Sequence, residues 1–252
     1  TALVFGTVHA HSADVILEAA RIRGMRLIAG KVLMDRNCPP DLRDDPESAY
    51  TDSKTLIERW HGNDRLGYAI TPRFAVTSSD EQLQAAGRLA QEYPDVWVHT
   101  HVYDHAGLLR ERSVFAHCLY LDEKDRQCMA SKGGAAAFCP TSNLFLGSGL
   151  FDLRAMRAAG IRCGLGTDVG GGTSLNLLRT ASEAYKVLHL QDQSLPASRA
   201  LYLATLGAAE SLYLDDKVGN FARGKDADFV VLDPAGSALS ARRSGVSANI
   251  DE

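Results

Sequence analysis

The chain contains 252 residues, of which 45% are hydrophobic and 23% are charged, as in one large α/β domain or two small globular ones. A formal net charge of −4, without any cluster of Lys and Arg, gives no electrostatic basis for binding nucleic acid. No apolar run approaches the roughly 18 residues of a membrane span and no signal-peptide pattern opens the chain, so we expect a cytoplasmic protein without a membrane partner.

The cysteines are odd in number and scattered along the chain, and none forms a CxxC pair. They are Cys38, Cys118, Cys128, Cys139 and Cys163. This spacing predicts neither a disulfide framework nor a cysteine zinc site. We expect reduced, mostly buried thiols.

Short apolar segments alternate with amphipathic segments as far as about residue 215. The predicted strands are Ala2–Val8, Arg26–Lys31, Gly67–Thr71, Val96–His101, Val114–His117, Ala135–Phe138 and Arg162–Gly166. The predicted helices are Ala13–Arg23, Ser53–Trp60, Glu81–Glu92, Asp122–Lys132, Leu153–Ala159 and Leu175–Leu190. The first helix would have Ser12 as its N-cap and Gly24 just past its end. This alternation predicts a parallel sheet with helices outside it.

Seven predicted strands are one short of a closed (β/α)8 barrel. We therefore predict an α/β fold in which residues 1–217 form a distorted (β/α)8 barrel, with the first strand missing before Thr1. Residues 218–252 would begin the C-terminal segment of a small β-sandwich domain, because Val218–Asp233 has the pattern of a turn followed by a strand. An open doubly wound sheet is the alternative.

The connection between the strands that end at His101 and begin at Val114 is unusually short. Its 12 residues are near the lower limit of roughly 10–12 for a helical crossover. We interpret this as the omission of a loop after His101. The omission matters because active-site loops follow the C-terminal ends of barrel strands.

Three residues with metal-binding or acid–base side chains each end a predicted strand: His101, His117 and Asp168. In a barrel these strand ends converge on one face, where such enzymes place their sites. Imidazole and carboxylate together suit zinc or iron(II), with one position left for water. A single histidine of this kind is more often a hydrogen-bonded core residue, but three coincident strand ends favour a site.

Two His-x-His patterns, His9-Ala-His11 and His99-Thr-His101, could each grip a metal, because residues i and i+2 of a strand share a face. Their spacing does not rank them. We interpret the other histidines as structural or solvated; they are His61, His105 and His189.

A glycine run follows Asp168 in Gly166-Thr-Asp-Val-Gly-Gly-Gly-Thr-Ser174. It could cradle a phosphate but matches no phosphate-binding motif, so we favour close approach of the backbone to a ligand.

Thr71-Pro-Arg73-Phe74 ends another predicted strand. An arginine there can donate to two adjacent acceptors, such as O6 and N7 of a guanine edge, and Phe74 could pack on a flat ring; the alternative is a surface arginine beside a packed phenylalanine.

These segments, in this order, resemble the guanine deaminases of the amidohydrolase superfamily, over nearly the whole chain. The segments that carry the resemblance are Ala29–Asn37, Thr71–Phe74, Ser113–His117, Ala137–Gly147, Gly164–Ser174 and Gly224–Asp233. The aspartate loop is typical of the superfamily. The Pro-Arg-Phe and Met-Asp-Arg-Asn stretches indicate guanine deaminase.

The resemblance implies hydrolytic deamination of guanine to xanthine and ammonia by a metal-activated water. It makes His101 and Asp168 metal ligands for one zinc ion, with iron(II) as the alternative, and makes Asp168 and His117 catalytic. Arg73 and Phe74 would contact the purine, together with His101 and Asp168. It also implies a homodimer, and gives Asn143 a supporting role at most.

The sequence departs from the family at two places. In the family, the His-x-His metal ligands lie at the end of the first strand, which we expect to precede Thr1. His9 and His11 would then lie on the second strand, and they would not be the family's metal ligands. A glutamate that shuttles protons should soon follow His101, where Val102-Tyr-Asp104 stands instead. Both departures coincide with the two irregularities above. The rival hypotheses are a related amidohydrolase that deaminates another heterocycle, a non-catalytic binding barrel, and a phosphate-binding enzyme that uses the glycine loop.

Overall fold

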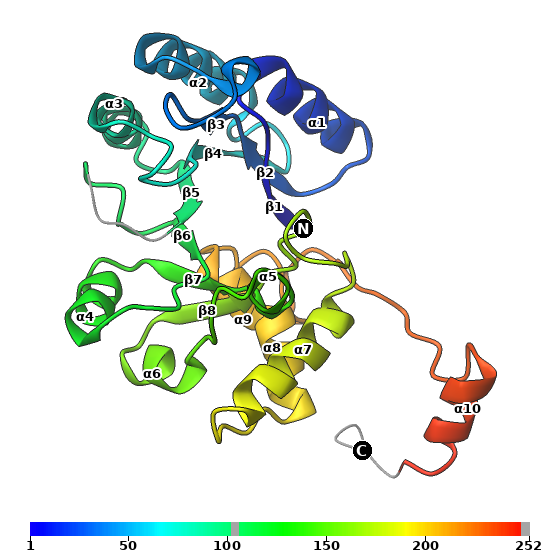
Figure 1. Cartoon of the computed structure of the whole chain (residues 1–252). Coiled ribbons are helices and arrows are strands. Elements are labelled where there is room, and N and C mark those ends of the chain that lie inside the picture. The colour runs from blue at the N-terminus through cyan, green and yellow to red at the C-terminus, as the bar shows by residue number, and fades with distance from the viewer. Residues whose placement is uncertain (102–105, 248–252) are drawn as a thin grey trace.

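A computed structural model describes residues 1–101 and 106–247, which form a parallel α/β sheet with helices around it (Figure 1). The strands are β1 (Ala2–Phe5), β2 (Leu27–Gly30), β3 (Val32–Leu33), β4 (Leu66–Pro72), β5 (Trp97–His101), β6 (Ser113–Ala116), β7 (Ala135–Phe138) and β8 (Arg162–Leu165). All seven predicted strands form, and the two-residue β3 is an addition. The predicted α/β fold with a parallel sheet is confirmed.

The strands are paired in the order β1-β2-β4-β5-β6-β7-β8, with β3 also paired to β4. A doubly wound sheet would reverse its strand order at a switch point, whereas this order follows the chain throughout. The sheet therefore curls in one direction, as in a (β/α)8 barrel. Within the described residues, no pairing joins β8 to β1, so the curled sheet is open there.

Helices α1–α3 lie beside the first strands of the curled sheet and α6–α9 beside the last, whereas α10 stands apart from the sheet (Figure 1). The helices are α1 (Ala10–Ile22), α2 (Pro46–Trp60), α3 (Asp80–Glu92), α4 (Glu123–Ser131), α5 (Pro140–Leu146), α6 (Leu153–Ala158), α7 (Leu177–His189), α8 (Ala197–Ala204), α9 (Leu206–Ser211) and α10 (Ala238–Ser244). A 3-10 turn spans Pro40–Leu42. No helix in the described part of the chain is long and apolar enough to cross a bilayer.

Local sequence explains several helix starts. Asp45 accepts hydrogen bonds from the amides of Glu47 and Ser48 at the start of α2, and Ser79 does the same for Gln82 in α3, as expected of N-cap side chains. The prediction of Ser12 as an N-cap is wrong. The helix α1 begins at Ala10, and the Ser12 hydroxyl donates to the carbonyl of His9 at 2.9 Å, a bond within the first turn.

The apolar core has two main parts, one on each half of the curled sheet. The first packs α1–α3 against β2, β4 and β5, and the second packs α4 and α6–α8 against β6–β8. A smaller cluster joins the halves where Trp97 packs near Leu214 and Val218. The Trp97 indole also donates to the carbonyl of Leu212 at 2.9 Å. These contacts lie at the start of β5, at the opposite end of the strand from His101.

Two sequence predictions concern segments that form neither a helix nor a strand in the described part of the structure. The predicted strand within Val218–Asp233 does not form: the apolar side chains of Phe229–Leu232 are largely exposed, and no described strand pairs with them. A strand needs a partner for its backbone hydrogen bonds, which explains the difference. The described part of the β5–β6 connection, residues 106–112, contains no helix, and Val102–His105 lie outside the described residues.

Candidate functional site

The structure brings the three predicted strand-end residues together at the C-terminal face of the sheet. His101 is the last residue of β5, His117 follows β6, and Asp168 comes three residues after β8. The ring centroids of His101 and His117 are 5.2 Å apart. His117 Nε2 lies 3.9 Å from Asp168 Oδ2. Two imidazoles and a carboxylate thus face one small volume at the strand ends.

The backbone after β6 and after β8 turns sharply to present these side chains. His117 has a φ of 69° and Asp168 a φ of 47°, in the left-handed region that such residues adopt seldom. The amide of Gly172 donates to the carbonyl of Asp168 at 2.5 Å, which closes the loop. A Cβ on Gly172 would lie only 2.0 Å from Thr167 O. Close packing of the loop on its own backbone therefore requires this glycine, whereas the predicted close approach of the glycine run to a ligand stays a prediction.

A backbone contact fixes the ring of His101. Its Nδ1 lies 2.6 Å from the carbonyl of Arg73, and because a carbonyl only accepts, Nδ1 carries the proton. The other ring nitrogen, Nε2, is then left with a lone pair for a ligand. Burial lowers the pKa of His101, and the bond to Arg73 O opposes that shift in part. The ring is accordingly held neutral and in one tautomer.

Asn143 holds the ring of His117. This buried asparagine lies in α5, and its Oδ1 is 2.7 Å from His117 Nδ1. Among the described residues, Asn143 Nδ2 has no hydrogen-bond partner. The sequence placed Asn143 near the site with a supporting role at most, whereas the structure gives it direct contact with His117. The only signal in the sequence was its place in a segment that follows a strand.

Arg73 and Phe74 follow β4 and lie beside His101. The ring centroid of Phe74 is 5.3 Å from that of His101. The guanidinium carbon of Arg73 lies 5.8 Å from the Phe74 ring, and one of its nitrogens lies 3.8 Å from the sulfur of Met34. Within the described part of the chain, the Arg73 guanidinium forms no ion pair with a carboxylate. An exposed cation and a half-buried ring therefore stand together at the edge of the site.

The two His-x-His patterns have different surroundings. His99 and His101 share a face of β5, as predicted, and both rings contact Phe5, with centroids 4.1 and 6.1 Å away. His99 is buried, and among the described residues its Nδ1 has no partner. Burial lowers its pKa to about 3, with a contribution from His101, so the ring is neutral at pH 7. His9 and His11 lie at the start of α1 with exposed side chains and are not part of this cluster.

The remaining described histidines, His61 and His189, also differ in their surroundings. His61 contacts Asp95 at 3.1 Å through Nε2 and accepts from the Tyr68 amide through Nδ1 at 3.1 Å, which is a structural role. His189 is exposed beside Tyr185. His105 lies outside the described residues.

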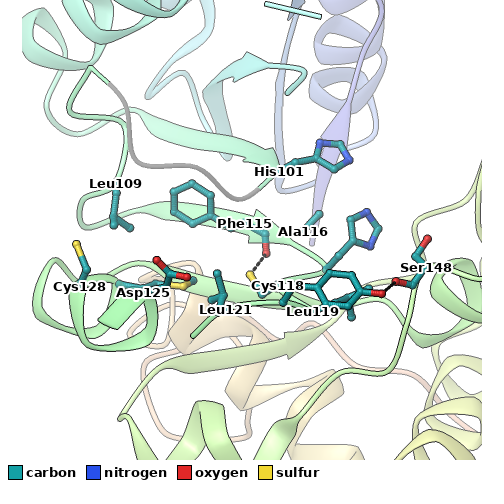
Figure 2. Close-up of a pocket in the computed structure, with 13 residues that line it drawn as sticks. His101, Leu109, Phe115, Ala116, Cys118, Leu119, Leu121, Asp125, Cys128 and Ser148 are labelled. Carbon is teal, nitrogen blue, oxygen red and sulfur yellow. Dashed lines mark hydrogen bonds between the residues drawn. The ribbon is translucent and has the colours of Figure 1, made fainter. Parts of the chain in front are cut away.

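A cavity of about 520 Å³ opens beside His101 and His117. Figure 2 shows its mainly apolar lining, with Leu109 and Phe115 on one side and Leu121 and Cys128 near α4. Neither Arg73 nor Asp168 lines it. The cavity is therefore adjacent to the predicted purine position and does not coincide with it.

The donor set fits part of a zinc site. Among the described residues, no group of three or more His, Cys, Asp or Glu side chains is placed to hold a metal ion. His101, with a free Nε2, and Asp168 are nevertheless the ligand types that a catalytic zinc uses. The predicted pair of metal ligands is chemically suitable but incomplete.

The sequence profile of the amidohydrolase family matches residues 1–113 and 102–250. Guanine deaminase from Escherichia coli strain K12 is 52% identical over 99% of this chain and 62% of its own length. A solved structure of the E. coli enzyme has a TM-score of 0.96, covering 99% of this chain and 63% of that one. The chain thus spans about three-fifths of the length of the curated relatives it matches.

Two further solved structures are informative. Guanine deaminase from Bradyrhizobium japonicum is 36% identical, with a TM-score of 0.92 over 99% of this chain and 65% of that one. Atrazine chlorohydrolase from Arthrobacter aurescens, solved with zinc, is 25% identical, with a TM-score of 0.74 over 90% of this chain and 57% of that one.

Proposed function

The chain belongs to the amidohydrolase family, and we propose that it is the greater part of an enzyme that hydrolyses guanine to xanthine and ammonia. One observation carries the proposal: His101, His117 and Asp168 meet at the strand ends, with Arg73 and Phe74 directly beside them. The similarity to guanine deaminases from two bacteria supports the same reaction.

In this proposal the purine lies beside the Phe74 ring, at the edge of the cluster formed by His101, His117 and Asp168. Arg73 donates to O6 and N7, and Phe74 packs on the flat face, so that C2 and its amine face Asp168. The guanidinium is available for this role because no described carboxylate neutralises it. Such placement lowers the barrier by fixing the reacting carbon before attack.

His101 and Asp168 would hold one zinc ion, with iron(II) as the alternative. The ion would supply a water that is acidic enough to react near neutral pH. The contact with Arg73 O keeps the proton of His101 on Nδ1, so that Nε2 faces the ligand position. Zinc in a related amidohydrolase structure supports this assignment.

Asp168 would accept a proton from the attacking water as the C2–O bond forms and pass it to ring nitrogen N3. It would then take the proton of the new C2 hydroxyl and pass it to the amine, which leaves as ammonia when the C2–N bond breaks and the C2 carbonyl forms. His117, oriented by Asn143, would stabilise the charge that develops at the reacting centre.

We also propose a cytoplasmic homodimer, in which residues 1–217 form the barrel and residues 218–252 begin a small β domain.

The test is ammonia release by the full-length, zinc-loaded protein from guanine, adenine and other ring amines. We expect activity on guanine, and a loss of about 10-fold to 100-fold in kcat/KM for Arg73→Ala, because one bidentate contact disappears. Arg73→Lys should recover only part of the loss, because it offers a point charge. No activity on guanine, with activity on another heterocycle, would replace this proposal by the related reaction.

A further inference from the structure

The loop Met34–Asn37, which follows β3, is bonded to the loop Arg73–Ser79, which follows β4, through contacts that the proposed reaction does not use. The two loops begin side by side, because the amide of Arg73 donates to the carbonyl of Leu33 at 3.1 Å. The Met34–Asn37 loop is also one of the stretches that the sequence singled out.

The main chain of the Met34–Asn37 loop and the side chain of Asp35 hold the far end of the neighbouring loop. The amides of Asp35 and Arg36 both donate to the carbonyl of Thr77, at 3.0 and 3.2 Å. The buried Asp35 carboxylate accepts from the Ser79 amide at 2.7 Å and from the Ser79 hydroxyl. Because Ser79 is the N-cap of α3, Asp35 also supports the fold.

Two exposed side chains hold the middle of the Arg73–Ser79 loop. Arg36 Nη2 donates to the carbonyl of Ala75 at 2.6 Å, and Asn37 Nδ2 donates to the carbonyl of Val76 at 2.7 Å. Asn37 has a φ of 49°, a conformation that asparagine adopts more readily than most residues. Ala75 and Val76 are themselves exposed, so burial does not fix this part of the loop. Hydrogen bonds do: the amides of Thr77 and Ser78 donate to the carbonyl of Phe74 within the loop, at 3.0 and 3.1 Å, and Arg36 and Asn37 supply the bonds to its middle from the neighbouring loop.

We propose that Arg36 and Asn37 are positioning residues for purine recognition: they hold the Arg73–Ser79 loop in the conformation that directs Arg73 and Phe74 at the substrate. This inference rests on the proposed function. Both residues act through main-chain carbonyls next to Phe74 and lie outside the apolar core, so their removal leaves the fold intact. Their effect should therefore depend on the presence of the Arg73 side chain.

A double-mutant cycle on the full-length, zinc-loaded protein tests this dependence. Arg36→Ala should lower kcat/KM for guanine by about 10-fold to 100-fold, since a small misplacement of a contacting group is costly. In an Arg73→Ala background, the same change should cost less than in the wild-type background, because only Phe74 and the main chain of the loop are then left to be misplaced and coupled residues are not additive. Equal losses in both backgrounds would overturn the inference. Asn37→Gly, which keeps the positive φ but removes the donor, should repeat the pattern.

Hydrogen–deuterium exchange provides a readout that does not need activity. Exchange in the peptide that covers Arg73–Ser79 should rise in both variants and stay unchanged elsewhere. The matched control is Arg23→Ala, an exposed arginine that donates to the carbonyl of Ala19 at 3.0 Å in α1 and should change neither readout. If the wild-type protein released no ammonia from guanine, the proposed function would fail, and unchanged exchange in the variants would separately overturn the positioning role.

Discussion

Gly172 should be indispensable to the conformation of the Asp168 loop, and Gly172→Ala is the most direct test of that geometry. The added Cβ would lie 2.0 Å from Thr167 O and 2.9 Å from Asp168 O, where ordinary contact begins at 3.4 Å. The loop must therefore move by about 1 Å or more. The φ of Gly172 is not positive, so alanine is excluded only by this contact and not by its backbone preference.

A shift of about 1 Å in a catalytic group can reduce a rate about 100-fold, and we expect that loss in kcat/KM for guanine from Gly172→Ala. Overpacking should also lower the free energy of unfolding by about 1–3 kcal/mol, measured by urea denaturation. The control is Gly245→Ala at the end of α10, where the new Cβ would meet nothing closer than 3.4 Å. A Gly172→Ala enzyme within 3-fold of the wild-type kcat/KM, a threshold of about 0.65 kcal/mol, would refute the reasoning.

Three further predictions use other parts of the structure. Asn143→Ala should lower kcat for guanine by about 10-fold to 100-fold with little change in KM, because it removes the acceptor that orients His117; an unchanged kcat would contradict this role. Burial raises the pKa of Cys139 and Cys163 from near 9 to about 12, so in the folded protein at pH 8.5 iodoacetamide should label both far more slowly than Cys38, as measured by mass spectrometry. Since their folded pKa lies above the unfolded value, the stability they contribute is complete below pH 9 and should decline as the pH rises towards 12; urea midpoints that do not fall over that range would contradict it.

The strand order and most helices could be predicted because the chain alternates apolar strands with amphipathic helices. In α3, for example, Leu83, Ala86 and Leu89 recur at helical spacing and all are buried. The errors lie where a contact decides the boundary. Ser12 has the residue type of an N-cap, but its hydroxyl bonds with Thr7 and with the first turn of a helix that has already begun.

The closeness of His101, His117 and Asp168 could be predicted because parallel strands end on one face. The hydrogen bonds that hold the site in place could not be predicted. Asn143 is 26 residues from His117, and Arg36 is 39 residues from Ala75. Such contacts depend on loop conformations, including the positive φ at His117 and Asn37, for which strand and helix periodicity gives no signal.

The peptide groups around Arg73 connect the proposed purine contact with the proposed metal ligand. The amide of Arg73 is bonded to Leu33 O, while its carbonyl is bonded to His101 Nδ1. A change in the Arg73 side chain leaves both bonds in place, so it should affect purine binding alone. A displacement of the Arg73 main chain would instead weaken the bond that fixes the His101 tautomer, and so affect the proposed metal ligand as well. Hence the conformation of the Arg73–Ser79 loop, and not only the identity of its side chains, should affect both the proposed purine contact and the proposed metal ligand His101.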